Sequence, residues 1–463
     1  METRKRNQLL GLLFAGVLMA ALDIAIVGPA LPSIRAEFGL DARGAAWVFS
    51  AYVLANLIGT PLMARLSDRF GRRAIYTLDI GLFALGSVLV AGSHGTGLFA
   101  VLLVGRVVQG LGAGGVFPVA SSVIGDTFPA DQRGRALGLI GAVFGIAFVI
   151  GPILGGLLLG FGWQWLFLIN LPVAAVVAAW GWRLLPHQPL APTARFDVAG
   201  MTVLAVALAT LAYGLGQIDT SRFWASVIEP QVAGWLAASL LAWVVLVPLE
   251  RRADSPVFPV TLFSRRQLRL GYVLTAGAGL GEASLVFLPS LAVAALGVSA
   301  GVGSYLLMPV VLAMGAGSPI AGRLLDRFGS RSVILAGVAL FAAGMFALGA
   351  TAASLPMFIV SGLLIGAGLS ALLGAPVRYV TLNETSADER SAAQGMVTTF
   401  TSIGQLLGSA VVGAVAASLP GAAGFEAAFS LLGALGVVLL VLALGLKSHG
   451  QEAPREAREA SHA

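Results

Sequence analysis

The chain has 463 residues, of which 57% are hydrophobic and 11% charged, with a mean hydropathy of +0.90 and a formal net charge of +6. So few charges cannot cover the surface of a soluble protein of this size, so much of the chain is expected to face lipid. Because the chain has no cysteine, it can form neither disulfides nor thiolate metal sites, and its four histidines lack the spacing of metal ligands.

Apolar runs long enough to cross a bilayer, which takes about 20 residues as a helix, follow one another along the whole chain. They predict fourteen transmembrane helices, which begin near residues 8, 45, 74, 98, 134, 164, 197, 231, 269, 300, 331, 355, 391 and 426. The first run follows a basic segment and resembles a signal peptide. Asp23 near its end and the many runs that follow favour an uncleaved helix.

The distribution of basic residues supports this count. With the N-terminus in the cytoplasm, 24 of the 28 Lys and Arg residues fall on the cytoplasmic side. Arg35, Arg43 and Arg222 fall on the other side, and Arg106 lies inside a helix. The positive-inside rule therefore predicts a multi-pass protein of the plasma (cell inner) membrane with both termini in the cytoplasm. Since topology accounts for the basic charge, nucleic acid is not an expected partner.

Two segments recur at nearly the same offset. Residues 64–73 match residues 322–331 at seven of ten positions with an offset of 258, and residues 130–138 resemble residues 387–395 with an offset of 257. The repeat predicts two parallel halves that form a site near the midplane where they meet. The predicted organisation is an N-terminal six-helix bundle (1–190), an inserted helix pair (191–255), a C-terminal six-helix bundle (256–447) and a polar cytoplasmic tail (448–463).

Four segments carry recognisable motifs: Asp68–Arg73 after the second helix, Arg106–Gly115 in the fourth, Gly151–Gly156 in the fifth and Leu22–Pro32 in the first. Together with Trp47, Tyr52 and the segment Trp163–Pro172, they resemble the major facilitator superfamily and, within it, the fourteen-helix drug:proton antiporters. The resemblance extends over about residues 8 to 446. It implies an all-α integral membrane protein with the major facilitator fold.

The same resemblance implies a function. A protein of this group is expected to be a monomeric, proton-coupled antiporter that exports lipophilic, often cationic, small molecules by alternating access. It is a transporter and not an enzyme, and it uses the proton gradient with no cofactor. The chain contains no phosphate-binding Gly-x-x-x-x-Gly-Lys loop, so ATP is not expected to drive it.

The resemblance also implies gating residues at the cytoplasmic loops. In the first half these are Asp68, Arg69, Gly71 and Arg72, with Asp126 or Asp79 as partners of the charged pair. The repeat adds Asp326, Arg327 and Gly329, although a mere topological anchor is the alternative. The antiporter motif comprises Gly151, Pro152, Gly155 and Gly156, whose small side chains and proline suit a hinge or a seal. Ordinary helix packing is the alternative for this face.

Three charged residues lie deep inside predicted helices, where charges are expensive and usually mark ion or proton pathways. Asp23 lies about 22 Å into the first helix, and Arg106 lies about 12 Å into the fourth from the other side, so the two could pair. Glu282 lies about 20 Å into the ninth helix and corresponds to Asp23 at an offset of 259. A carboxyl group removed from water holds its proton more tightly, so these residues are candidates for proton coupling. The alternatives are structural pairing of Asp23 with Arg106 and a hydrogen-bonded Glu282.

Aromatic and thioether side chains let a cavity accept varied lipophilic shapes. Candidates in the predicted cavity helices are Tyr52, Phe144, Phe148, Tyr272, Phe287, Tyr305 and Met308. Packing or lipid contact is the alternative for each of them.

Other functions remain open at this stage. A lipid or a dedicated metabolite could be exported on the same fold, and a nutrient symporter is a second alternative. A membrane-embedded transferase would need Asp-rich metal motifs in loops, and none is present.

Overall fold

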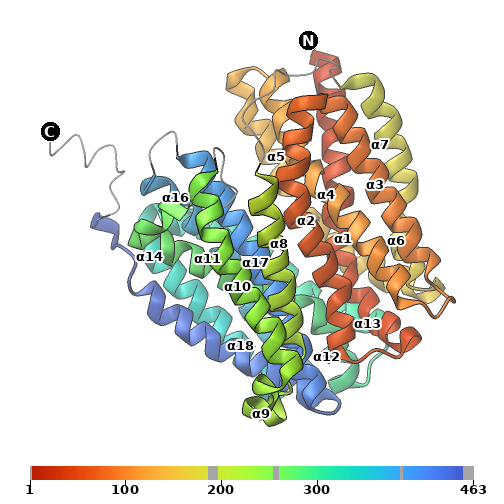
Figure 1. Cartoon of the computed structure of the whole chain (residues 1–463), viewed down its shortest axis with the longest axis vertical. Coiled ribbons are helices and arrows are strands. Elements are labelled where there is room, and N and C mark those ends of the chain that lie inside the picture. The colour runs from red at the N-terminus through yellow and green to blue at the C-terminus, as the bar shows by residue number, and fades with distance from the viewer. Residues whose placement is uncertain (1–2, 186–196, 254–259, 386–388, 452–463) are drawn as a thin grey trace. The chain divides into compact units, whose positions relative to one another are not determined.

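The computed structural model describes residues 3–185, 197–253, 260–385 and 389–451, and all regular structure in these ranges is helical (Figure 1). The helices of the first half are α1 (Thr3–Phe38), α2 (Ala42–Phe70), α3 (Arg72–Gly92), α4 (Phe99–Thr127), α5 (Ala130–Leu158), α6 (Gln164–Leu168) and α7 (Asn170–Leu184). The middle of the chain forms α8 (Val198–Gly216), α9 (Phe223–Ile228) and α10 (Pro230–Arg252). The remaining helices are α11 (Arg266–Ser284), α12 (Leu288–Leu296), α13 (Ala300–Tyr305), α14 (Met308–Thr351), α15 (Leu355–Leu372), α16 (Ala375–Asn383), α17 (Arg390–Ser418) and α18 (Ala422–Ala443).

Short 3-10 helices join several of these elements. They are η1 (Leu159–Phe161), η2 (Thr220–Arg222), η3 (Val260–Ser264), η4 (Leu285–Phe287) and η5 (His449–Gln451). Two of them complete predicted crossings, because η4 continues α11 into α12 and η1 ends α5.

Twelve helical stretches of the described residues are long and apolar enough to cross a membrane. One of these, Ala300–Thr351, has 52 residues and would extend about 78 Å, more than twice the thickness of a bilayer core. It turns at Gly329, where the backbone leaves the helical region with φ 76°, so it accommodates two crossings. Helix α5 has 29 residues and accommodates another. The helices thus have room for fourteen crossings, and that count stays a prediction of the charge pattern.

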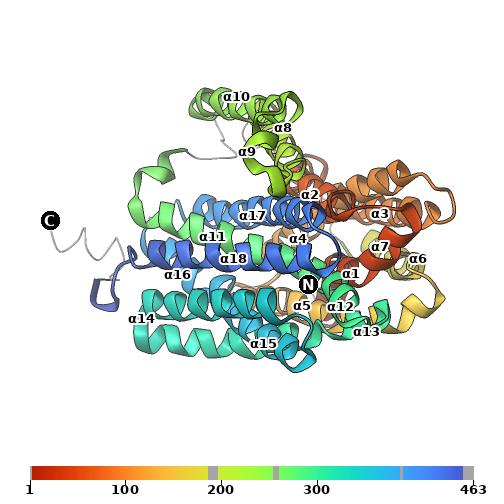
Figure 2. The ribbon, with the colours of Figure 1, turned by 90° about the horizontal axis from the view of Figure 1, so that it is seen from below.

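The chain divides by its contacts into an N-terminal unit (Met1–Ala205 with Ala300–Tyr305) and a C-terminal unit (Val206–Ser299 with Leu306–Ala463). In the N-terminal unit α1 packs on α5, α4 packs on α2 and α3, and α3 packs on α7. In the C-terminal unit α11 packs on α17, and α14 packs on both α15 and α18 (Figure 2). These are the same pairings shifted by one repeat, so the sequence repeat is also a repeat of packing.

The contact division differs from the predicted domains in two places. Helix α13 belongs by its contacts to the N-terminal unit, although the sequence assigns it to the C-terminal bundle. The inserted pair joins the C-terminal unit from Val206 onward, and the N–H of Thr220 donates a hydrogen bond to the hydroxyl of Ser418 in α17 (2.9 Å). Hydropathy predicts where the chain crosses the membrane, but it does not predict which neighbour a helix packs on. The domain bounds therefore stay predictions.

Candidate functional site

The two deepest charges of the N-terminal unit form an ion pair. Arg106 of α4 donates from Nη1 to Oδ2 of Asp23 in α1 (2.5 Å), and both side chains are completely buried. The guanidinium also donates from Nε to the carbonyl of Val48 (2.9 Å) and lies 4.3 Å from the ring centre of Tyr52. The pairing that their depths predict is therefore present.

Polar neighbours from two further helices complete this cluster. Gln109, one turn after Arg106, donates to Asp23 Oδ1 (3.0 Å) and to the hydroxyl of Ser87 in α3 (2.8 Å). The amide of Asn170 in α7 donates to the same hydroxyl (3.3 Å). Gln109 and Asn170 lie within the motif segments Arg106–Gly115 and Trp163–Pro172, but no role was predicted for either of them. The signal was available for Gln109, because residues three apart on a helix share a face.

The corresponding acid of the C-terminal unit has a different environment. Glu282 lies near the end of α11, is partly exposed, and accepts a hydrogen bond from Nε2 of Gln405 in α17 (3.0 Å). No ion pair is recorded for it within the described ranges. Gly344 of α14 approaches Ser361 and Ile365 as Gly86 of α3 approaches Gly105 and Gln109, so Arg106 corresponds to Gly362 and the arginine has no counterpart in this unit. The two acids share a position in the repeat and differ in charge balance.

The first loop motif has the charge pairs that the resemblance implies. Arg72 lies at the start of α3 and donates to Asp68 (2.5 Å) and Asp126 (3.1 Å). Gly71 joins α2 to α3 with φ 92°, a conformation that side chains with a Cβ rarely adopt. Of the two predicted partners, Asp126 makes the contact. Asp79 makes none with Arg72.

The second copy of this loop keeps the backbone and lacks the recorded pairs. Gly329 repeats the positive φ, and Arg327 lies over the ring of Phe328 (5.1 Å) as Arg69 lies over Phe70 (5.3 Å). Asp326 and Arg327 are exposed, and within the described part of the chain neither has a recorded ion pair. The repeat of sequence is thus a repeat of the turn, while the charge network is particular to the first loop.

The antiporter motif lies where α5 meets α1 and α13. A Cβ atom at Gly151 would overlap Ala25, and one at Gly155 would overlap Pro29 and Ser304. The hydroxyl of Ser304 donates to the carbonyl of Pro152 (2.8 Å). Proline has no N–H, so it cannot donate the helical hydrogen bond to the carbonyl of Phe148, four residues earlier. A methyl group at Gly156 would overlap the ring of Tyr305 in the same way.

The aromatic residues predicted to line a substrate cavity differ in their surroundings. Tyr52 packs under Arg106, Tyr272 stacks on Phe400 with ring centres 5.2 Å apart, and Phe287 is 1% exposed. Phe148 and Met308 are half-buried, and Tyr305 is 41% exposed. The side chain of Phe144 lies outside the described residues. Substrate contact by any of them stays a prediction.

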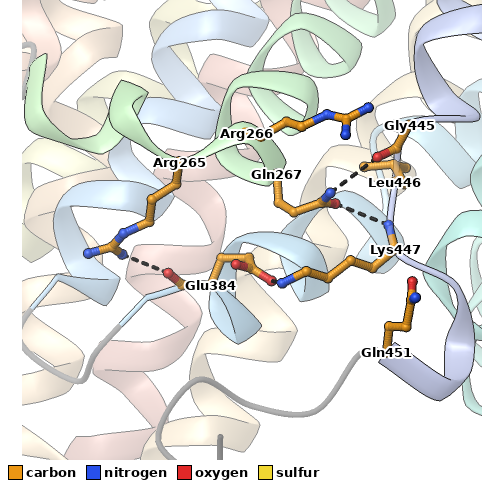
Figure 3. A pocket seen from close by; sticks show the side chains of 8 residues that line it. All are labelled: Arg265, Arg266, Gln267, Glu384, Gly445, Leu446, Lys447 and Gln451. Atoms are coloured by element: carbon orange, nitrogen blue, oxygen red, sulfur yellow. Dashed lines mark hydrogen bonds and ion pairs between the residues drawn. The ribbon is translucent and has the colours of Figure 1, made fainter. Parts of the chain in front are cut away.

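A cavity of about 760 Å³ lies elsewhere in the C-terminal unit, at the beginning of α11 (Figure 3). Its walls are held by polar bonds: Gln267 donates to the carbonyl of Gly445 (3.2 Å), Lys447 pairs with Glu384, and Arg265 donates to the Glu384 carbonyl (2.6 Å). None of the predicted coupling or cavity residues lines it. These bonds tie the start of α11 to the end of α16 and to the segment after α18.

Long apolar helices in two repeated bundles, with buried charges inside them, define a polytopic α-helical membrane transporter. A sequence profile of the Major Facilitator Superfamily matches residues 13–292 and 271–463, and the chain belongs to this superfamily.

Relatives of similar length support this assignment. The uncharacterized MFS-type transporter YfiU of Bacillus subtilis (strain 168) is 32% identical over 413 residues, which cover 88% of this chain and 79% of that protein. The multidrug resistance protein Stp of Mycobacterium tuberculosis (strain ATCC 25618 / H37Rv) is 31% identical over 423 residues, 89% of this chain and 76% of that one. The multidrug transporter protein MdtP of Bacillus subtilis (strain 168) is 29% identical over 420 residues, covering 89% and 75%.

Solved structures show the same fold at low identity. A D-xylose-proton symporter superposes with a TM-score of 0.68 at 16% identity, covering 96% of this chain and 98% of that chain. The human organic anion transporter MFSD10 superposes with a TM-score of 0.57 at 19% identity, covering 96% and 100%. At such identities the likeness extends to the fold alone.

Proposed function

We propose that the protein is a proton-coupled antiporter that exports lipophilic, often cationic, small molecules from the cell by alternating access. It acts as a monomer in the plasma membrane with both termini in the cytoplasm. The names of the relatives Stp and MdtP support the substrate class, and the charge distribution supports the orientation. The observation that carries the proposal is Glu282, a carboxyl group inside an apolar bundle whose recorded partner is the neutral amide of Gln405.

The chemistry of coupling follows from this environment. An apolar environment favours the neutral form of a carboxyl group even where the group is partly exposed, and an adjacent cation stabilises the carboxylate. When a cationic substrate binds beside Glu282, the O–H bond breaks and the proton passes to water. When a proton returns from the other side of the membrane, the acid becomes neutral and the cation leaves. Substrate and proton thus compete for one oxygen pair, which is sufficient for exchange.

The N-terminal unit has a separate role in this proposal. Asp23 is already neutralised by Arg106 and has no exposed surface, so it does not present a free charge to a substrate. The cluster around it fixes α1 against α2, α3, α4 and α7, and it moves as one body. The Arg72 pairs hold the first cytoplasmic loop closed and part when the cytoplasmic side opens.

The antiporter motif seals the bundle in the same cycle. The bond from Ser304 to Pro152 attaches α13 to α5 without charge, so it can break and re-form at modest cost. Tyr305, the most exposed of the predicted cavity residues whose side chains are described, is the one that we propose to contact substrate.

Reconstituted vesicles test this function. Purified protein in proteoliposomes with an imposed pH gradient is expected to transport tetraphenylphosphonium against its gradient, and collapse of the pH gradient should stop it. Transport of anionic or neutral lipophiles but not of cations would contradict the proposed preference for cationic substrates. Transfer of a labelled phospholipid between leaflets would assign the protein to lipid export. Transport that persists without any pH gradient would contradict proton coupling.

A further inference from the structure

A third acid lies inside the N-terminal unit, and the proposed cycle does not use it. Asp79 of α3 is completely buried, and neither of its carboxyl oxygens has a hydrogen-bond partner among the described residues. It faces α4 where that helix has Gly112 and Gly115. A Cβ atom at Gly115 would overlap the carboxyl group, so the acid lies directly against the bare backbone of α4.

No charged side chain near Asp79 balances it. On α3 the adjacent titratable group is Tyr76, whose hydroxyl is also buried and has no recorded partner. The charged groups on the helices packed against α3 are engaged or distant. On α4, Arg106 bonds Asp23 and Asp126 bonds Arg72, and they lie about 13 and 16 Å along the helix from Gly115.

The other helices packed against α3 also provide no cation that pairs with Asp79. On α2, Asp68 bonds Arg72, Arg69 is exposed beside Phe70, and Arg65 is partly exposed and forms no hydrogen bond with Asp79. On α7, Arg183 is exposed near the helix end, and α6 has no charged residue. Tyr76 faces Gly16 of α1, whose nearest acid, Asp23, is paired with Arg106. An ionised carboxylate without cation, hydrogen bond or water is far more costly to bury than the neutral acid.

The repeat supplies an internal comparison for this position. At an offset of 258, Asp79 corresponds to Gly337 on α14, which packs on α15 so closely that a Cβ atom would overlap Ala371. The equivalent pair of helices in the C-terminal unit therefore packs without an acid. The fold therefore does not require an acid at this point. Because only the N-terminal unit has one, we expect Asp79 to have a function that is specific to that unit.

The position of Asp79 relates it to the first loop. Arg72, Tyr76 and Asp79 lie on one buried face of α3, with Asp79 about 10 Å along the helix from Arg72. The bond from Arg72 to Asp126 closes the same seam between α3 and α4 in which Asp79 is buried. Any parting of that seam that admits water reaches Tyr76 and then Asp79.

We propose that Asp79 is a second proton-binding site, separate from the Asp23 cluster and from Glu282, which gains a proton when the α3–α4 seam closes and loses it when the seam opens. On opening, the carboxyl O–H bond breaks and the proton passes to water, and on closing a proton from water restores the neutral acid. Its contribution to transport rests on the proposed function, whereas the proton binding itself does not. Because the closed seam binds one more proton than the open seam, lowering the pH favours closure, by up to about tenfold per pH unit.

Infrared spectroscopy of the full chain in lipid vesicles tests the proton directly. Near neutral pH the wild-type protein should show a carboxylic C=O band that is absent from Asp79→Asn and from Asp79→Gly, the residue of the other half. The band should persist in Glu282→Gln. Two variants guard against misfolding of either one, and a spectrum in which neither loses a protonated-acid band would overturn the proposal.

A second measurement separates proton binding from a merely structural role. Since the chain has no cysteine, spin labels on Phe70→Cys and Pro129→Cys would report the α2–α3 and α4–α5 turns alone. The fraction of open seam should rise with pH in the wild type and be independent of pH in Asp79→Asn. The same pH profile in both would contradict the proposal. Loss of transport coupling in Glu282→Gln with an intact Asp79 band would support both proposals, and intact coupling there would remove only the proposed function.

Discussion

The two units place an acid at corresponding points of the repeat and treat it differently. Asp23 is fully buried and bonded to Arg106 and Gln109, so its charge is cancelled inside the N-terminal unit. Glu282 is partly exposed and bonded to the neutral Gln405, so its charge has no recorded counterpart within the described C-terminal unit. A neutralised pair is suited to holding helices together, and an acid without a cation is suited to exchanging a proton for one. In the proposed function, this difference divides one repeated position into a structural site and a coupling site.

The largest expected effect is on the paired acid. Replacing Arg106 by Gln leaves the carboxylate of Asp23 buried without a cation, which should lower stability by about 3–5 kcal/mol. Thermal unfolding in detergent checks this, with the double variant Asp23→Asn/Arg106→Gln as the matched control. The double variant should recover most of the loss, because no charge remains buried. Equal losses in the single and double variants would show that the ion pair does not hold the cluster.

A smaller effect is expected at the antiporter motif, whose proline and glycine pair are present only in the N-terminal unit. Gly155→Ala inserts a methyl group against Pro29 and Ser304, and such overpacking typically costs about 1–3 kcal/mol. Since the corresponding residue of the other unit is Val412, which is fully buried, the requirement for glycine is local. Transport should fall at least about tenfold, a change equivalent to about 1.4 kcal/mol.

Gly160→Ala is the control for that substitution, because a Cβ atom there meets nothing within 4 Å. It should transport as the wild type does. If Gly155→Ala also transports normally, the close approach of α5 to α1 and α13 is ordinary packing without a part in the cycle.

The smallest effect distinguishes the two loop motifs. Asp68→Asn removes a bond to Arg72 and should lower stability by about 1 kcal/mol and slow transport. Asp326→Asn alters an exposed residue with no recorded ion pair in the described chain, and its effect should stay within about 0.5 kcal/mol. Transport rates of both variants at matched expression would measure the contrast. Equal defects in the two would mean that both loops gate.

Much of the fold could be predicted because lipid imposes a simple length rule on the chain. The apolar runs expected near residues 74 and 355 begin in the structure as α3 at Arg72 and α15 at Leu355. The contact of Asp23 with Arg106 could be predicted because rise per residue converts sequence position into depth. The depth of a residue in its helix and the repeat between two segments both follow from the sequence alone, so they can be predicted without knowing how the helices pack.

The direction in which a side chain faces could not be predicted in this way. The packing of Tyr52 under Arg106 could not be predicted, because an apolar helix has no polar stripe to mark its inner face, and its place in a substrate cavity stays a prediction. Asp79 was one of two acids proposed as partners of the loop charges, and it faces the glycines of α4. Asp79 lies seven residues after Arg72, so the two share a face of α3. They are two helical turns apart, which is too far for their side chains to touch.

Substrate-driven proton release tests the assignment of coupling to Glu282 most directly. Addition of tetraphenylphosphonium to the purified protein in weakly buffered detergent solution should release protons from the wild type and from Glu282→Asp, which retains a carboxyl group. Glu282→Gln should release none while its thermal unfolding stays close to that of the wild type, because glutamine can still bond Gln405. Undiminished release from a folded Glu282→Gln protein would contradict the account and move coupling to another acid.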